Sequence, residues 1–281
     1  MSRPPTISDV AAQAGVSKKT VSRVINGSPL VRPEMLARVE AAIAELGFVP
    51  DEDARNLGRR RSKTLPQPSP RDREAEEVLS LSPVIPVVTL DDARLAPALA
   101  RALLAGGLRT VEITLRTPAA LDAIRAVARE TPEMVVGAGT VLSERDLEAA
   151  IEAGARYALS PGGTPKLMKA AHNAAIPFIP GVATASEIMR GMELGYTCFK
   201  FFPAEQIGGA AALKSLGAPL AAARFCPTGS ITAEKAPAYL ALDNVLCVGG
   251  SWIAPPDKIK AGDWAGIEAA ARRAAALKPV A

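Results

Sequence analysis

Residue types that many active sites use are scarce in this sequence. Its 281 residues include one histidine, His172, and three cysteines, Cys198, Cys226 and Cys247. A single histidine supplies neither a His-rich metal site nor a Ser-His-Asp triad. The cysteines lie more than 20 residues apart, with no second Cys or His at ligand spacing, which is typical of structural thiols. Catalysis would therefore rest on Lys, Glu, Arg and Thr, and we expect neither a metal nor another cofactor.

Long apolar runs are also missing. No run approaches the roughly 18 residues that cross a bilayer, and no charged segment followed by an apolar one opens the chain. We therefore expect a cytoplasmic protein without membrane contact. Aromatic residues make up only 4% of the chain, but hydrophobic residues make up 48%, so an aliphatic core can form and disorder throughout is excluded.

Basic residues outnumber acidic ones in the N-terminal part of the chain and nowhere else. Residues 1–74 hold 13 Lys/Arg and 9 Asp/Glu, whereas the remainder holds 20 of each, so this segment carries the whole net charge of +4. Within it, "TISDVAAQAG", "VSKKTVSRVING" and "RPEMLARVEAAIAELG" read as short helices separated by tight turns. We expect an all-α domain over residues 1–58, then a basic, proline-rich linker over residues 59–81.

A different pattern follows from about residue 82. Eight short apolar segments, each followed by an amphipathic helical pattern, begin near residues 84, 110, 134, 155, 178, 198, 224 and 245. Eight parallel strands alternating with helices indicate an α/β fold of the (β/α)8 TIM-barrel type, whereas a doubly wound sheet would need fewer strands. We therefore expect a TIM barrel over residues 82–281.

Lys200 stands in the otherwise apolar strand "CFKFFP". Burying an ammonium group costs several kcal/mol unless it is paired or loses its proton. The simpler alternative is a structural lysine whose charged end reaches solvent. Active sites of TIM barrels lie at the C-terminal ends of the strands. Besides Lys200, the predicted strands place there Glu112, Arg116, Thr140, Ser160, Pro161 and Thr228. This gathering favours a reactive lysine.

The chemistry of such a group follows from its residue types. A lysine at the rim of an apolar pocket, near a cation such as Arg116, loses its proton more readily, and the neutral amine forms a Schiff base with a ketone. The iminium accepts electrons when an adjacent carbon–carbon bond breaks, while Glu112 moves protons directly or through one water. The loops "CPTGSI" and "VGGSW" follow the last two strands, where TIM barrels usually bind phosphate. Their glycines also fit plain turn chemistry, but their joint position predicts a phosphate site.

The barrel segment resembles a known family. The motifs "VEITLRT", "VGAGTVL", "SPGGT", "IPGVATASE", "FKFFPAE", "FCPTG" and "CVGGSW" make residues 83 to about 275 resemble class I 2-keto-3-deoxy-6-phosphogluconate (KDPG/KHG) aldolases of the Entner-Doudoroff pathway. The resemblance implies that Lys200 forms the Schiff base and that Glu112 is the general acid/base. It further implies substrate contacts by Arg116, Thr140, Pro161 and Thr228, and phosphate contacts by Gly229, Ser230, Gly249, Gly250 and Ser251. The family usually has Gly where this chain has Ser230, which restricts φ.

The N-terminal segment resembles a second family, although composition alone would favour a charged surface on a small helical bundle. "TISDVAAQAGVSKKTVSRVING", "RVEAAIAELGFVP" and "ARNL" are similar to the DNA-binding headpiece of lactose repressors, a helix-turn-helix. The resemblance implies a hinge helix with Leu57 as minor-groove wedge. It implies a recognition helix that meets DNA through Ser17, Lys18, Lys19, Ser22 and Arg23. Two departures are Asp51, where the family usually has Asn, and the barrel in place of the family's sugar-binding sensor.

Two functions remain open. The leading hypothesis is an aldolase that cleaves 2-keto-3-deoxy-6-phosphogluconate to pyruvate and glyceraldehyde 3-phosphate, and also 4-hydroxy-2-oxoglutarate, with an appended module for double-stranded DNA. The alternative is a transcriptional regulator that uses the barrel as ligand sensor or assembly module. All motif residues of the Schiff-base site are present, which favours catalysis. The resemblances imply a homotrimer through the barrel but paired headpieces on two-fold DNA sites.

Overall fold

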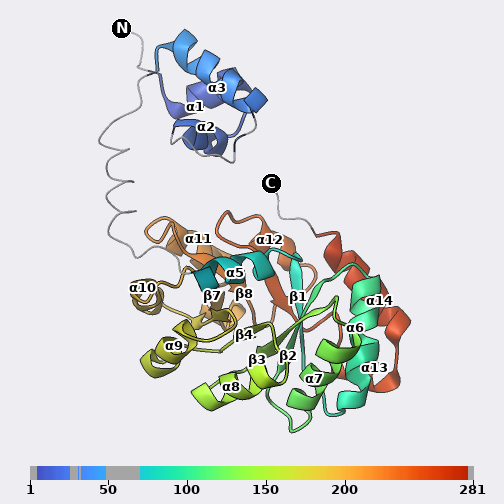
Figure 1. Ribbon diagram of the computed structural model, residues 1–281. Coiled ribbons are helices and arrows are strands. Elements are labelled where there is room, and N and C mark those ends of the chain that lie inside the picture. The colour runs from blue at the N-terminus through green and yellow to red at the C-terminus, as the bar shows by residue number, and fades with distance from the viewer. Residues whose placement is uncertain (1–4, 26–30, 32, 49–69, 278–281) are drawn as a thin grey trace. The chain divides into compact units, whose positions relative to one another are not determined.

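The computed structural model describes residues 5–25, 31, 33–48 and 70–277 (Figure 1). The chain divides into two compact units, Met1–Leu65 and Pro66–Ala281. Within the described residues, no helix is both long enough and apolar enough to cross a membrane.

The described part of the first unit consists mainly of the helices α1 (Ile7–Ala14), α2 (Lys18–Ile25) and α3 (Pro33–Leu46). Their apolar faces meet in a small core that includes Val10, Val21 and Val39. These helices confirm that the N-terminal region is helical, while the predicted bounds of 1–58 stay a prediction.

Local signals fix where the first two helices begin and end. The backbone N–H of Thr6 donates to the carboxylate of Asp9 at 2.7 Å, and Gly15 ends α1 with a left-handed φ of 63°. The Oγ of Ser17 accepts the backbone N–H of Thr20 at 3.1 Å, so Ser17 caps α2. The tight turn that a helix-turn-helix needs therefore lies between Gly15 and Ser17.

The second unit is a closed ring of parallel strands surrounded by helices (Figure 1). Six strands pair in the order β5-β4-β3-β2-β1-β9, and β6, β7 and β8 pair with one another. The ring closes because β5 continues into β6 and because single bridges, Phe225–Val245 and Thr228–Gly249, connect the region of β8 with that of β9. The predicted TIM barrel is confirmed. The strands are β1 (Val84–Val88), β2 (Thr110–Thr114), β3 (Val135–Gly139), β4 (Tyr157–Leu159), β5 (Phe178–Ile179), β6 (Gly181–Val182), β7 (Cys198–Phe201), β8 (Arg224–Pro227) and β9 (Val248–Gly250).

The fifth predicted strand is broken into β5 and β6. Pro180 separates the two pieces, and a proline has no N–H to donate to a strand ladder. Its carbonyl still accepts the backbone N–H of Lys200 at 2.9 Å. Lys200 on β7 therefore belongs to the sixth strand of the barrel, as the sequence predicts.

Helices cover the outside of the ring, and most follow directly after a strand. Several begin at N-cap residues: Thr164 Oγ1, for example, accepts the N–H of Leu167 at 3.2 Å. The helices are α6 (Ala96–Ala105), α7 (Ala120–Glu130), α8 (Glu144–Glu152), α9 (Pro165–His172), α10 (Ala185–Glu193), α11 (Gly209–Gly217), α12 (Ala236–Leu240), α13 (Pro256–Ala261) and α14 (Trp264–Ala275), with short 3-10 turns η1 (Ala93–Leu95) and η2 (Glu205–Ile207).

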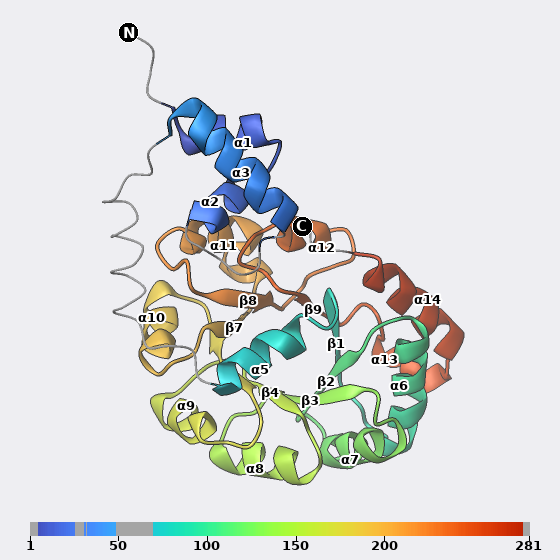
Figure 2. The ribbon, with the colours of Figure 1, turned by 45° about the horizontal axis from the view of Figure 1, so that its top comes forward.

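One further helix, α5 (Pro70–Leu79), lies inside the segment that the sequence predicted as a linker. It lies across the end of the ring in Figure 2, and its Ala75 and Leu79 join the buried interior of the barrel. The carboxylate of Asp72 accepts the backbone N–H groups of Thr197 at 2.8 Å and Cys198 at 3.2 Å, where β7 begins. The predicted linker of 59–81 is therefore wrong over residues 70–79, because this helix has its own apolar and hydrogen-bonding partners in the barrel. Residues 49–69 lie outside the described part.

Strand alternation decides which side chains enter the barrel. Successive strand residues point to opposite faces, so Cys198 and Lys200 point inward while Phe199 and Phe201 face the helices. In agreement, the ring of Phe199 fills the space beside Gly191 of α10. The start of β7 thus contributes a thiol near α5, and its C-terminal end contributes an amine on the side away from α5.

Candidate active site

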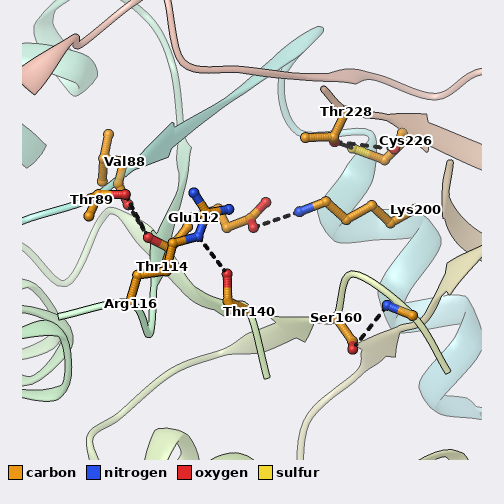
Figure 3. A network of polar contacts seen from close by, with 11 residues as sticks. Val88, Thr89, Glu112, Thr114, Arg116, Thr140, Ser160, Lys200, Cys226 and Thr228 are labelled. Atoms are coloured by element: carbon orange, nitrogen blue, oxygen red, sulfur yellow. Dashed lines mark hydrogen bonds and ion pairs between the residues drawn. The ribbon is translucent and has the colours of Figure 1, made fainter. Parts of the chain in front are cut away.

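The centre of the candidate site is an ion pair between Lys200 and Glu112 inside the barrel (Figure 3). Nζ of Lys200 lies 2.8 Å from Oε1 of Glu112, and the two side chains are only 5% and 1% exposed. The sequence suggested a nearby cation, Arg116, but the residue in direct contact with Lys200 is a carboxylate. A proton that passes along this contact from nitrogen to oxygen leaves a neutral amine beside a carboxylic acid, so the pair can itself activate the nucleophile.

Two glycines of β3 leave the space that neighbouring side chains of the site occupy. A Cβ on Gly139 would lie 2.1 Å from Oε1 of Glu112, and one on Gly137 would lie 2.4 Å from Cζ of Tyr157. Real atoms do not approach this closely, so both positions require glycine unless their neighbours move. Glycine inside a strand pattern commonly marks such a close approach.

Arg116 and Thr140 lie together beside the pair. Nε of Arg116 donates to Oγ1 of Thr140 at 3.1 Å, and the guanidinium is exposed at the mouth of the barrel. Thr140 has φ of 60°, a left-handed conformation that is rare for a β-branched residue and costs about 1–3 kcal/mol. Behind them, Oγ1 of Thr114 donates to the carbonyl of Val88 at 3.1 Å and lies 2.8 Å from Oγ1 of Thr89. Strained backbone of this kind clusters at functional sites.

Ser160 and Pro161 follow β4 at the same end of the barrel. Oγ of Ser160 accepts the backbone N–H of Gly162 at 3.3 Å. A Cβ on Gly181 would lie only 2.2 Å from the carbonyl carbon of Pro161, so this loop packs directly on β6. The loop is therefore held against the strand next to β7.

The two predicted phosphate loops meet at Thr228. A Cβ on Gly249 would lie 2.3 Å from Oγ1 of Thr228, and these two residues form a parallel bridge. Gly229 and Ser230 continue from Thr228, while Gly250 and the exposed Ser251 continue from Gly249. The structure thus brings all five predicted phosphate residues to neighbouring loops at the mouth of the barrel.

Ser230, where the aldolase family usually has glycine, keeps a glycine-like backbone. Its φ is 56°, in the left-handed region, and its Oγ accepts the side-chain amide of Gln206 at 2.9 Å. The departure from the family pattern therefore adds a hydroxyl and a contact to η2 without changing the turn.

The three cysteines lie together inside the barrel, and Cys226 pairs in register with Lys200. Cys198, Cys226 and Cys247 are buried in one cluster with Ala75 and Leu79 of α5. Burial raises the pKa of the Cys198 and Cys247 thiols far above their usual range. This environment fits structural thiols. Across residues 5–25, 31, 33–48 and 70–277, no three His, Cys, Asp or Glu side chains gather at a metal-binding spacing, and the expectation of a metal-free reaction stays a prediction.

Two family models match the sequence. The model of the family "KDPG and KHG aldolase" matches residues 75–270, and the model of "Bacterial regulatory proteins, lacI family" matches residues 6–51. The chain belongs to the KDPG and KHG aldolase family. Both resemblances seen in the sequence motifs are thereby confirmed, and the aldolase match includes part of α5.

Individual relatives agree with the family match. The chain is 51% identical over 200 residues to the KHG/KDPG aldolase of Escherichia coli K12, covering 71% of this chain and 94% of that protein. The structure of 2-keto-3-deoxy-6-phosphogluconate aldolase from Zymomonas mobilis ATCC 29191 has a TM-score of 0.70 at 48% identity and covers 73% of this chain and 98% of its own. The KDPG aldolase of Legionella pneumophila, solved with pyruvate captured as a covalent carbinolamine, has a TM-score of 0.70 at 43% identity over 71% and 97% of the two chains.

The predicted DNA contacts are only partly within the described residues. Lys18, Lys19 and Arg23 are exposed on α2, and Ser22 is half-buried there. Ser17 is exposed, and its hydroxyl also caps α2. Leu57 and Asp51 lie outside the described residues.

The sequence did not single out every residue that shapes the site. Thr89 lies in no quoted motif, and Thr114 lies within "VEITLRT" without having been singled out; the two hydroxyls become relevant because β1 and β2 pair. Gly139 could have been found as a glycine within the strand "MVVGAGTV", a pattern that signals close approach of another group. Tyr157 has no comparable signal, since its position inside the barrel depends on the register of β4.

Proposed function

We propose that this protein is a Schiff-base aldolase that cleaves 2-keto-3-deoxy-6-phosphogluconate to pyruvate and glyceraldehyde 3-phosphate. The observation that carries the proposal is the buried contact of 2.8 Å between Lys200 and Glu112 at the open end of a TIM barrel. Relatives at about half sequence identity are named KHG/KDPG aldolase or 2-dehydro-3-deoxy-phosphogluconate aldolase, which supports the substrate class. The first of these names also supports 4-hydroxy-2-oxoglutarate as a second substrate.

Each step assigns a bond change to a residue. The neutral amine of Lys200 adds to the C2 keto carbon, and loss of water gives an iminium. Glu112 removes the proton of the C4 hydroxyl, the C3–C4 bond breaks, and its electrons pass to the iminium to give an enamine while the aldehyde leaves. Proton return to C3 and hydrolysis of the new iminium release pyruvate and restore Lys200. The reaction consumes no oxidant or reductant.

The remaining residues orient the substrate. Arg116 and Thr140 hold the carboxylate of the pyruvate portion, Pro161 contacts the same end, and Thr228 contacts the sugar chain. Guanidinium groups suit carboxylates because they offer a planar pair of donors. The phosphate lies between the loops of Gly229–Ser230 and Gly249–Ser251, so the unphosphorylated sugar acid should be a much poorer substrate.

Borohydride trapping tests the proposal. Incubation of the full chain with pyruvate and borohydride is expected to leave a reduced adduct on Lys200, found by peptide mass spectrometry. Lys200→Arg keeps a cation beside Glu112 but forms no stable Schiff base, so we expect neither adduct nor turnover. Glu112→Gln should turn over roughly 100-fold slower or worse and still be trapped, because a positioned acid/base contributes about that factor.

A matched control separates chemistry from folding. Lys258 forms a partly exposed ion pair with Asp263 at 3.0 Å, and Lys258→Ala should leave trapping and turnover unchanged. An adduct on another lysine, or full activity of Lys200→Arg, would overturn the assignment. Turnover that stops when a chelator removes divalent metals would contradict the metal-free mechanism.

We propose a second function for the N-terminal module, binding of double-stranded DNA through Lys18, Lys19 and Arg23, supported by Ser17 and Ser22. The match of residues 6–51 to lacI-type regulators and the exposure of the three basic side chains favour it. Binding to a palindromic duplex should weaken steeply with salt, and Lys18→Ala should reduce the slope of log affinity against log salt by about one unit. The proposal also includes Leu57 as a wedge in the minor groove and a homotrimer that forms through the barrels.

The rival role, a regulator with the barrel as ligand sensor or assembly module, makes an opposite prediction. A sensor would bind pyruvate or the sugar acid and change its DNA affinity, yet would show no turnover under trapping conditions. Catalysis together with ligand-independent DNA affinity would exclude it.

A further inference from the structure

Three buried side-chain oxygens on β2 and β4 have no hydrogen-bond partner among the described residues. They are Oε2 of Glu112, the hydroxyl of Tyr157 and Oγ1 of Thr110, and each of these residues is at most 1% exposed. A buried polar atom without a partner costs about 1–3 kcal/mol. Native interiors usually satisfy such atoms with an ordered water that makes about three hydrogen bonds.

The strand register brings Tyr157 and Glu112 to one level of the barrel. Glu112 pairs with Gly137, and Gly137 pairs with Tyr157. Side chains at paired positions project from the same face of a sheet. Because Gly137 has no side chain, the ring of Tyr157 lies over it, with Cζ, the carbon that carries the hydroxyl, 2.4 Å from where a Cβ would be. The ring of Tyr157 therefore extends from β4 over β3, the strand next to that of Glu112.

The two oxygens of Glu112 face different neighbours. Oε1 contacts Nζ of Lys200 at 2.8 Å and lies over Gly139. Oε2 has no protein partner among the described residues, although it is as buried as Oε1. A donor that reaches Oε2 would hold the second oxygen, and the carboxylate would then be fixed through both of its oxygens.

We propose that a bound water bridges the hydroxyl of Tyr157 and Oε2 of Glu112, which makes Tyr157 a positioning residue for Glu112. The inference rests on the proposed role of Glu112 as acid/base. Tyr157 donates its proton to the water, and the water donates to Oε2. Glu112 is thereby held with Oε1 toward Lys200.

The electrostatics of the surroundings fit this direction of donation. Burial, together with the charge of Glu112, raises the pKa of Tyr157 well above its usual range. The phenol therefore keeps its proton and can donate it in a hydrogen bond to the water. The other titratable groups near Glu112 are Lys200 on β7, Arg116 after β2, Cys226 on β8 and Cys247 before β9.

Tyr157→Phe in the full chain tests the proposal, because it removes only the hydroxyl. We expect kcat to fall about five-fold, the effect of one net hydrogen bond, with KM nearly unchanged. Without the bridge the carboxylate is no longer held in place, so the dependence of kcat/KM on pH should also differ from that of the wild type. Borohydride trapping on Lys200 should persist.

Tyr196→Phe is the matched control. Tyr196 is also a buried tyrosine, but its hydroxyl donates to the carbonyl of Met168 at 2.7 Å, among the outer helices. Its loss should lower stability while leaving kcat and the pH profile in place. If Tyr157→Phe matched wild type in kcat and pH profile, Tyr157 would be only a packing residue and the proposal would fall.

A crystal structure of the wild-type chain gives an independent readout. We expect one ordered water within hydrogen-bond distance of both the Tyr157 hydroxyl and Oε2 of Glu112. A direct contact between these atoms, or no water there at high resolution, would overturn the bridge. If trapping showed that Lys200 does not react, the proposed function would fail, while the water would still be seen or not seen.

Discussion

Glu112 reaches Lys200 because Gly139, on the neighbouring strand, has no side chain. A Cβ at this position would lie only 2.1 Å from Oε1 of Glu112. The ion pair therefore depends on this glycine as much as on the two charges. A buried ion pair adds little stability on balance, so its presence is better explained by chemistry than by folding.

Gly139→Ala should displace the Glu112 carboxylate and lower kcat by about 100-fold, since small misplacements of a catalytic group cost about this much. We also expect a loss of about 1–3 kcal/mol in the free energy of unfolding from overpacking. Gly162→Ala is the control, because a Cβ there meets nothing within 4 Å. Equal kcat for the two variants would show that Glu112 does not need this position.

Ser230→Gly tests the departure in the phosphate loop. Serine at φ of 56° carries a cost of roughly 1–2 kcal/mol that glycine does not. We expect the glycine variant to bind the phosphorylated substrate more tightly, seen as a lower KM, with no change for the unphosphorylated acid. Gln206→Ala removes the contact to Ser230 but keeps its backbone restriction, so it should not lower KM. A raised KM in Ser230→Gly would instead identify the hydroxyl as a phosphate ligand.

At the scale of elements, α5 is the part that sequence patterns misplace. Its residues, "PRDREAEEVL", carry mostly charge and little apolar character, so they read as a linker. The few apolar side chains are sufficient to hold α5 on the barrel, because Ala75 and Leu79 are buried in the cluster at its end. Asp72 anchors the helix further, because its carboxylate accepts two backbone N–H groups at the start of β7.

Asp72→Ala should lower the free energy of unfolding by about 2–3 kcal/mol, because it leaves the N–H groups of Thr197 and Cys198 buried without their partner. Urea unfolding of the barrel measures the change. Arg71→Ala is the control, since Arg71 and Glu74 form a pair whose side chains are 42% exposed, and such pairs contribute under about 1 kcal/mol. Equal losses in both variants would mean that α5 is not anchored through Asp72.

At the scale of the whole molecule, the boundary between the two units decides what each can do alone. Residues 66–281 form one unit that includes α5, and residues 1–65 contain the helix-turn-helix. A chain that begins at Pro66 should keep aldolase activity and lose DNA binding. A chain that begins at Ala75 lacks Asp72 and should be less stable by about the same 2–3 kcal/mol as Asp72→Ala. Thermal unfolding, turnover and a salt titration of DNA binding measure the three effects, and loss of catalysis in the longer fragment would show that the units depend on each other.

The sequence by itself determined the elements and the residue types of the site. Apolar segments of strand length and helical periodicity are local signals, and they located every strand of the barrel and the candidate site residues Lys200, Glu112 and Thr140. Resemblance of motifs added both families. Only the tertiary structure decided which atoms meet: that Lys200 contacts a carboxylate rather than Arg116, that α5 closes the barrel, and that Tyr157 lies across Gly137 toward Glu112. These contacts join strands and helices far apart in the chain, and their geometry follows from strand register and barrel closure, which no local pattern of residues encodes.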